Sequence, residues 1–197
     1  MARSSRHPNV VVFFTDQQRW DTAGVHGNPM GLTPNFDRMA LEGTHLYNAF
    51  TCQPVCMPAR ACVQTGMFAT QVQCHTNGCA LPHSARTLAQ YFTAAGYHTG
   101  YIGKWHLSRE QIVPPTDRGG YREWLGANVL EWCSDAYNCI MYDDDGRPVH
   151  LPGYRVDALA DAAIRFMDKH QSRPFFLFTA FLEPHFQNQR DDYPPPD

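Results

Sequence analysis

Hydrophobic residues gather in short continuous runs that alternate with amphipathic stretches along this chain of 197 residues. The continuous runs predict strands buried on both faces at residues 10–15, 99–102 and 174–182. Helical spacing, with capping residues before it and glycines after it, predicts helices at residues 34–42, 58–65, 84–95 and 156–170. This alternation indicates an α/β fold, with a mostly parallel central sheet flanked by helices on both faces.

The segment 108–153 breaks the alternation, because Gly, Pro and Asp are frequent in it. We expect an irregular insertion whose loops shape a substrate site, with one hairpin that turns at Asp145-Gly146. A short extended piece is expected at residues 45–50, and residues 191–197 have the composition of a loop. No internal repeat is visible, so residues 1–197 are treated as part of one domain.

The composition indicates a domain with a hydrophobic core, since 43% of the residues are hydrophobic. No apolar run approaches the ~20 residues of a membrane span, so we expect no membrane partner. The formal net charge is −3 with both signs interspersed, and nothing favours a nucleic-acid partner. Few residues precede the first predicted strand, which leaves no room for a signal peptide of ~15–30 residues and predicts a cytoplasmic protein.

The chain has seven cysteines, an odd number. Without a secretory segment, we expect reduced thiols rather than a disulfide framework. Cys74 and Cys79 have a spacing that occurs in zinc sites, but no second pair follows at a regular distance, so structural zinc is not expected.

Polar side chains follow the three predicted strands at their carboxyl ends, namely Asp16, then Lys104 and His106, then His185. Parallel strands bring such ends to one edge, where open α/β sheets bind ligands. Cys56 stands just before a predicted helix, with Arg60 one turn inside it. A carboxylate for a hard cation, a helix N-terminus and fixed cations together suit an anionic ester.

Six short motifs occur in order along the chain: DQQR at 16–19, TPNFD at 33–37, CMPAR at 56–60, TG at 65–66, GKWHL at 103–107 and EPHF at 183–186. Together they resemble the N-terminal half of a type I, formylglycine-dependent sulfatase of the alkaline-phosphatase superfamily. The ordered set is far more specific than any single motif. The resemblance implies an alkaline-phosphatase-like fold that is incomplete at the C-terminus, with residues 1–197 as the N-terminal portion of a longer catalytic domain.

The resemblance implies that Cys56 is oxidised to formylglycine by a formylglycine-generating enzyme. One hydroxyl of the hydrated aldehyde would attack sulfur and release the alcohol, and the other would lose its proton and expel sulfate. Arg60 would orient this group. Ala59 departs from the serine that is commonest in the family, which puts the efficiency of the modification in doubt. The alternative for Cys56 is a buried apolar cysteine without reactivity.

The resemblance also assigns roles to four further residues. Lys104 would bind a sulfate oxygen, and His106 would assist breakdown of the hemiacetal. His185 would contact the sulfate or protonate the leaving oxygen, and Asn77 would contact the ester oxygen. The alternatives are a surface lysine and hydrogen-bonded polar residues without a catalytic role.

The cation site implied by the resemblance consists of Asp16, Gln17 and the modified Cys56, around Ca²⁺ or, alternatively, Mg²⁺ or Mn²⁺. Many relatives have a second aspartate at the position of Gln17. A neutral carbonyl ligand is acceptable to these cations but lowers the charge of the site. Asp16 could instead be a strand-end carboxylate that caps a loop.

Three functions remain open on the sequence alone. The leading hypothesis is a sulfuric ester hydrolase that acts on a small sulfated substrate, because Cys56, Lys104 and His106 all match. Gln17 also occurs in phosphonate monoester and phosphodiester hydrolases of the superfamily, which makes these the first alternative. The second alternative is a non-catalytic fragment or pseudoenzyme that lacks the C-terminal half of the site.

Overall fold

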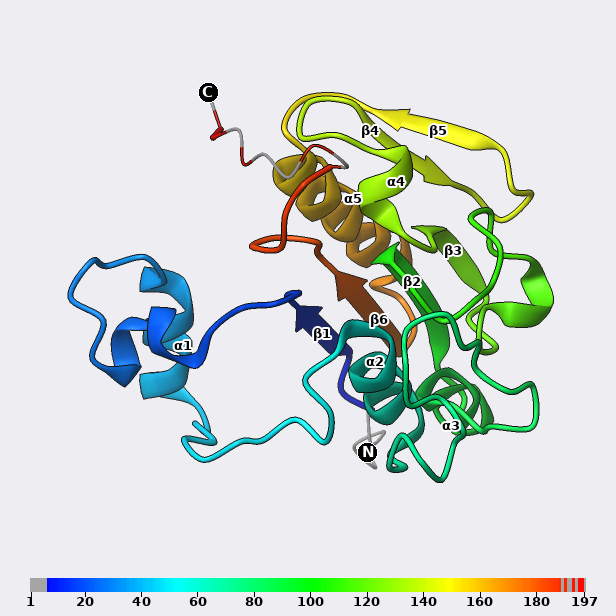
Figure 1. The fold of residues 1–197 in the computed structure, drawn as a ribbon, viewed down its shortest axis with the longest axis horizontal. Coiled ribbons are helices and arrows are strands. Elements are labelled where there is room, and N and C mark those ends of the chain that lie inside the picture. The colour runs from blue at the N-terminus through cyan, green and yellow to red at the C-terminus, as the bar shows by residue number, and fades with distance from the viewer. Residues whose placement is uncertain (1–6, 189, 191–192, 194, 197) are drawn as a thin grey trace, which may run out of the picture.

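The fold is seen in a computed structural model that describes residues 7–188, 190, 193, 195 and 196. Six strands form one sheet in the order β1-β6-β2-β3-β4-β5 (Figure 1). The strands are β1 (Val10–Phe14), β2 (His98–Lys104), β3 (Glu123–Ala127), β4 (Cys139–Tyr142), β5 (Pro148–Leu151) and β6 (Phe175–Ala180). The α-helices are α1 (Pro34–Glu42), α2 (Cys56–Thr65), α3 (Leu88–Ala94), α4 (Leu130–Cys133) and α5 (Arg155–His170). Short 3₁₀ turns are η1 (Trp20–Thr22), η2 (Gly24–His26) and η3 (Pro115–Asp117).

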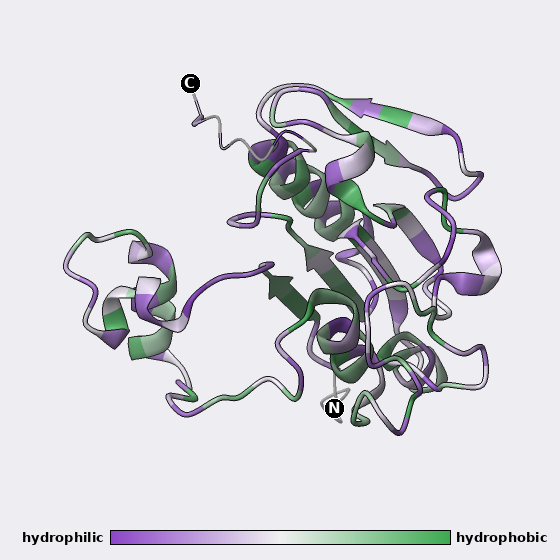
Figure 2. Cartoon of the chain, viewed as in Figure 1, coloured by the Kyte–Doolittle hydropathy of each residue, from purple (hydrophilic) through white to green (hydrophobic). Residues whose placement is uncertain are grey.

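The first four strands of the sheet, β1, β6, β2 and β3, run parallel, and β4 and β5 are antiparallel at the far side. This confirms the α/β class with a mostly parallel central sheet. Strand β6, which lies between β1 and β2, is mainly apolar (Figure 2) and buried along its whole length. Phe176 and Phe178 face the layer that contains α2 and α3, whereas Phe175 and Leu177 face α5. Helices therefore flank both faces of the sheet, as predicted. The expectation that the first strand is buried on both faces is wrong, because Val11 and Phe13 of the edge strand β1 are exposed.

The segment between β1 and α2 extends away from the sheet and carries α1 in an outer lobe, residues 17–50 (Figure 1). A stack of rings holds this lobe together: Trp20 lies 4.0 Å from His26 between ring centroids, and His26 is hydrogen-bonded to His45 at 2.9 Å. Helix α1 buries none of its residues. Exposed apolar side chains of the lobe include Met30, Phe36, Met39, Leu41, Leu46 and Phe50.

Most predicted elements are present, and the differences have local causes. The helix predicted at 84–95 begins only at Leu88, because Thr87 forms a capping box with Gln90. The helix at 34–42 is confirmed, but the Thr33 hydroxyl donates to the Asp37 carboxylate instead of accepting a bond from the helix backbone. The extended piece predicted at 45–50 is wrong, since those residues form turns and irregular backbone.

The segment 108–153, which we expected to be irregular, contains β3, α4 and a β4–β5 hairpin. The hairpin turns at Asp145-Gly146 as predicted, with Tyr142 paired to Pro148. Of the loop predicted at 191–197, Asp191, Asp192, Pro194 and Asp197 lie outside the described residues. Among the residues that are described, no helix is long and apolar enough to cross a membrane.

Candidate active site

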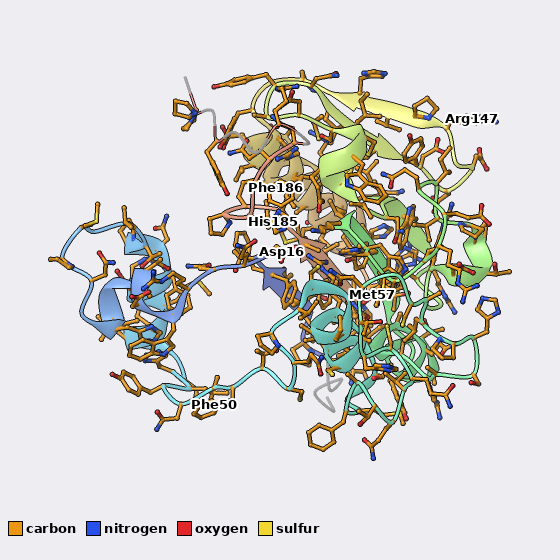
Figure 3. All side chains as sticks on the ribbon, viewed as in Figure 1. Asp16, Phe50, Met57, Arg147, His185 and Phe186 are labelled. Atoms are coloured by element: carbon orange, nitrogen blue, oxygen red, sulfur yellow. The ribbon has the colours of Figure 1, made fainter. Side chains whose placement is uncertain are left out.

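The carboxyl ends of β1, β6 and β2 meet at one edge, because these strands are adjacent and parallel. The residues predicted at the three strand ends therefore come together. Asp16 lies two residues beyond β1, Lys104 is the last residue of β2, and His185 follows β6. Figure 3 shows Asp16 and His185 close together beyond the ends of their strands. The predicted convergence at the sheet edge is present in the structure.

Asp16 is the centre of a buried ion-pair cluster. Its Oδ2 accepts from Nζ of Lys104 at 2.8 Å and from Nη2 of Arg60 at 3.2 Å. Burial alone would raise the pKa of this carboxyl, but the charges of Arg60 and Lys104 outweigh burial and lower it to about 2. Asp16 is therefore an ionised carboxylate at any pH near neutrality, held between two cations.

Arg60 reaches the cluster from α2 and is buried. Its Nη1 donates to the backbone carbonyl of Lys104, and its guanidinium lies 5.3 Å from the centre of the Phe14 ring. One side chain thus ties α2 to the ends of both β1 and β2. This position is set by the helix, since Arg60 is one turn beyond Cys56.

Cys56 is the first residue of α2, whereas the sequence predicted that the helix would begin near Pro58. Pro58 is tolerated at the third position, because the first N–H groups of a helix have no intrahelical partner. The Cys56 thiol donates to Oδ1 of Asn77 at 3.4 Å, and the backbone N–H of Met57 donates to the same oxygen at 3.3 Å. The structure therefore brings Asn77 into contact with Cys56.

The segment directly after β2 does not continue the strand. His106 has a φ of 56°, in the left-handed region. Trp105 packs into the interior against Tyr101, Tyr121 and Trp124. His106 is buried, and burial, followed by the charges of Lys104 and Arg60, lowers its pKa to about 4. The imidazole is therefore neutral near neutral pH.

An open cavity of about 770 Å³ lies over the cluster. Its lining includes Asp16, Gln17, Cys56, Arg60 and His185. Lys104 and His106 are not in the lining and lie beneath it. The cavity therefore exposes the candidate nucleophile and the carboxylate, while the lysine supports them from below.

Glu131 belongs to this site and was missed by the sequence analysis. It lies on the four-residue helix α4, is buried, and its Oε1 accepts from Nζ of Lys104 at 3.0 Å. A four-residue helix has too little periodicity to be recognised in a sequence. The only available signal was an acidic residue in an apolar stretch, next to Leu130 and Trp132.

The residues at the end of β1 fit a hard cation. Both ion pairs of Asp16 use Oδ2, and no described residue hydrogen-bonds to Oδ1. Gln17 is exposed on the cavity wall and has a φ of 56°. A carboxylate and an amide carbonyl are oxygen donors of the type that Ca²⁺, Mg²⁺ and Mn²⁺ prefer. These two residues supply only part of the six to eight ligands that Ca²⁺ typically takes.

A second set of possible ligands lies at the opposite edge of the sheet, where donor atoms of His98, Glu123 and His170 are all within 4.8 Å. Arg173 donates to Nδ1 of His170, at 2.8 and 3.2 Å. Because a guanidinium only donates, neutral His170 carries its proton on Nε2 and donates it to Glu123 at 2.8 Å. That nitrogen has no free lone pair, so we interpret the triad as an ion-pair network.

Comparison with known proteins gives a consistent result. The protein-family model described as "Sulfatase" matches residues 8–197. The chain is 34% identical to an ulvan-active sulfatase of Formosa agariphila over 95% of its length, and 32% identical to the uncharacterized sulfatase YidJ of Escherichia coli over 91%. It spans 39% of the length of each of these relatives.

Solved structures agree with the sequence relatives. The structure of yidJ from Bacteroides fragilis superimposes with a TM-score of 0.83 at 26% identity, covering 94% of this chain and 46% of that one. A protein solved in complex with its substrate D-glucosamine-2-N,6-O-disulfate gives a TM-score of 0.80 at 29% identity, covering 91% of this chain and 35% of that one.

Proposed function

This chain belongs to the sulfatase family, and from that premise we propose that it forms the N-terminal part of the active site of a sulfuric ester hydrolase. The observation that carries the proposal is the cluster in which Asp16, Arg60 and Lys104 are fixed beside Cys56. Two rigidly held cations stabilise negative charge as it develops on sulfate oxygens, without reorganising during the reaction.

The proposal includes a modified Cys56 and a divalent cation. Formylglycine formed from Cys56 supplies a hydrated aldehyde with a nucleophilic hydroxyl. Asp16 and Gln17 would hold Ca²⁺, or Mg²⁺ or Mn²⁺, which polarises sulfate oxygens when bound. Asn77 supports the first of these assignments, because its Oδ1 contacts both the Cys56 thiol and the next backbone N–H and so fixes the direction of side chain 56.

His185 and His106 can play different roles in proton transfer. Nδ1 of His185 lies 3.0 Å from the carbonyl oxygen of Phe186, so the hydrogen on Nδ1 is donated there. Nε2 is then the nitrogen left for the leaving alcohol, to which it can give a proton when the imidazole is doubly protonated. His106, neutral because of its low pKa, can accept a proton within the site. We assign His185 to the leaving group and His106 to the group at position 56.

We further propose a sulfated carbohydrate as the substrate class. The support is that relatives named for ulvan, N-acetylglucosamine-6-O-sulfate and N-acetylgalactosamine-6-sulfate share 28–34% identity with this chain. The cavity of about 770 Å³ is large enough for a sugar, since small-molecule sites typically span ~300–1,000 Å³.

The decisive experiment compares esters with the natural full-length protein, produced together with a formylglycine-generating enzyme. We expect turnover of nitrophenyl sulfate and of sulfated monosaccharides, and much slower turnover of phenylphosphonate and phosphodiesters. Cys56→Ala should abolish activity, whereas Cys52→Ala, at an exposed cysteine four residues earlier, should retain it. A strong preference for phosphorus esters would make the enzyme a phosphonate or phosphodiester hydrolase instead. Absence of all turnover in the modified protein would indicate a pseudoenzyme.

A further inference from the structure

We propose that Glu131 is a positioning residue for Lys104 and thereby sets the direction in which the lysine donates to the substrate. The inference rests on the proposed sulfatase function and extends it to a residue outside the recognised motifs. Glu131 reaches the site from α4, which follows β3 directly. Since Lys104 is in register with Ala127 on β3, the backbone pairing places Glu131 beside the end of β2.

The ammonium group of Lys104 has a defined set of partners. Nζ lies 2.8 Å from Oδ2 of Asp16 and 3.0 Å from Oε1 of Glu131, and the side chain is completely buried. An ammonium has three donor hydrogens. Two are directed by these carboxylates, so the direction of the third is determined as well. Nζ has no third partner among the described residues, and we assign its third hydrogen to a sulfate oxygen, which would have to reach Nζ from the cavity above.

The two carboxylates are not equivalent. Asp16 also accepts from Arg60 at Oδ2, and its Oδ1, which no described residue hydrogen-bonds, is the oxygen proposed to bind the cation. Glu131, by contrast, has Lys104 as its hydrogen-bond partner in the described part of the chain. A cation bound to Asp16 would weaken the ion pair between Asp16 and Lys104. Glu131 would then be the remaining carboxylate that fixes the position of Nζ.

A second observation concerns the other oxygen of the Glu131 carboxylate. Its Oε2 is buried and has no hydrogen-bond partner among the residues that the structure describes, and the same holds for Nδ1 of His106. A buried carboxylate oxygen without a partner costs stability, on the order of 1–3 kcal/mol. Glu183, which pairs with Arg155, shares this feature, so the unpaired oxygen shows a cost and the contact with Lys104 carries the assignment. The arrangement is explained if Glu131 is retained for its effect on Lys104.

The test is a double-mutant cycle in the natural full-length enzyme, carrying the modification at position 56. Glu131→Gln retains the shape of the side chain and removes its charge. We expect kcat to fall at least about tenfold while KM does not rise, because Lys104 keeps its charge but loses its direction. In a Lys104→Ala background the same change should lower kcat less than about twofold, since there is no ammonium left to direct.

Binding of inorganic sulfate, measured by calorimetry, supplies a readout apart from turnover. Lys104→Ala should weaken sulfate binding at least about tenfold, whereas Glu131→Gln should not weaken it. Glu123→Gln is the matched control, because it breaks an ion-pair network at the opposite edge and should leave kcat unchanged. If the glutamine variant does not fold, Glu131→Asp keeps the charge with a shorter reach, and its kcat should fall between those of the wild type and Lys104→Ala.

The inference is overturned if Glu131→Gln changes kcat less than about twofold, or lowers it equally in both backgrounds. If the wild type hydrolyses no sulfate ester, the proposed function fails separately. Crystal structures of the wild type and Glu131→Gln with sulfate then decide: Nζ of Lys104 touching sulfate with the same geometry in both would refute the positioning role.

Discussion

Gly103, directly before Lys104, offers a sharp test of how the sheet positions the site. Its φ is 109°, a conformation that residues with a Cβ rarely adopt. A methyl group built on Gly103 would overlap the carbonyl oxygen of Ala180 on β6 and lie 2.8 Å from the carbonyl carbon. Gly103→Ala must therefore push β2 away from β6 at the point where Lys104 begins.

The expected loss of stability in Gly103→Ala has two parts. Holding alanine at this φ costs about 1–3 kcal/mol. Relieving the overlap with a backbone group of the neighbouring strand costs about 1–3 kcal/mol more, by analogy with overpacked cores. We therefore expect a loss of about 2–6 kcal/mol in the free energy of unfolding, measured by urea denaturation of the natural protein. Activity should fall further than stability accounts for, since the Lys104 carbonyl receives bonds from Arg60 and Tyr101.

Gly153→Ala is a matched control for the cost of holding an alanine at a positive φ. Its φ is 81°, and a methyl group there would meet nothing within 4 Å. Gly153→Ala should cost only the backbone term, about 1–3 kcal/mol. The difference between the two variants thus isolates the contact between β2 and β6. Equal losses of stability in both variants would refute the close approach of Gly103 to Ala180 and the positioning argument built on it.

Four further results are expected. Peptide mass analysis of protein made with a formylglycine-generating enzyme should show loss of the thiol at Cys56 but not at Cys62; an unmodified Cys56 would count against the proposed nucleophile. Trp105→Ala should lower the free energy of unfolding by about 3–5 kcal/mol, since this side chain is completely buried, and a loss below 1 kcal/mol would contradict its packing. Burial raises the pKa of Glu123, but hydrogen bonds from Lys169, His170 and His98 outweigh burial and lower the pKa from 4.5 to about 2. The wild type should therefore have a higher free energy of unfolding than Glu123→Gln, with the full difference above pH 4.5 and a shrinking difference toward pH 2. Chelation of divalent cations should abolish turnover and weaken sulfate binding measured by calorimetry, and unchanged binding would argue against the cation.

The three strands that position the site could be predicted from their short, mainly apolar runs, although only β6 is buried along its whole length and β1 leaves Val11 and Phe13 exposed. The edge they share follows from parallel pairing alone, so Asp16, Lys104 and His185 could be assigned to one place without a structure. Strand β3 could not be predicted. It mixes Glu123 and Gly126 with apolar residues, and it is stabilised by pairing with β2 rather than by its own pattern.

The parts of the site that escaped prediction depend on contacts between distant segments. Glu131 pairs with a residue 27 positions earlier, and no local pattern encodes that distance. The left-handed backbone of His106 was also missed, because a histidine has no intrinsic requirement for it. The Lys104–Glu131 pair and the left-handed backbone of His106 both lie where β2 and β3 end side by side. They therefore depend on how the sheet is assembled and not on the GKWHL motif alone.

The charges of the cluster explain why a cation belongs in the proposed mechanism. Arg60 and Lys104 are matched by the buried carboxylates of Asp16 and Glu131, and His106 is neutral. A sulfate monoester, which is an anion, therefore meets directed donors but little net positive charge. A divalent cation held by Asp16 would draw that carboxylate's charge away from the two side-chain cations and add positive charge of its own. Glu131 would then remain as the anion that holds Lys104, which links the positioning role inferred above to the electrostatics of the whole site.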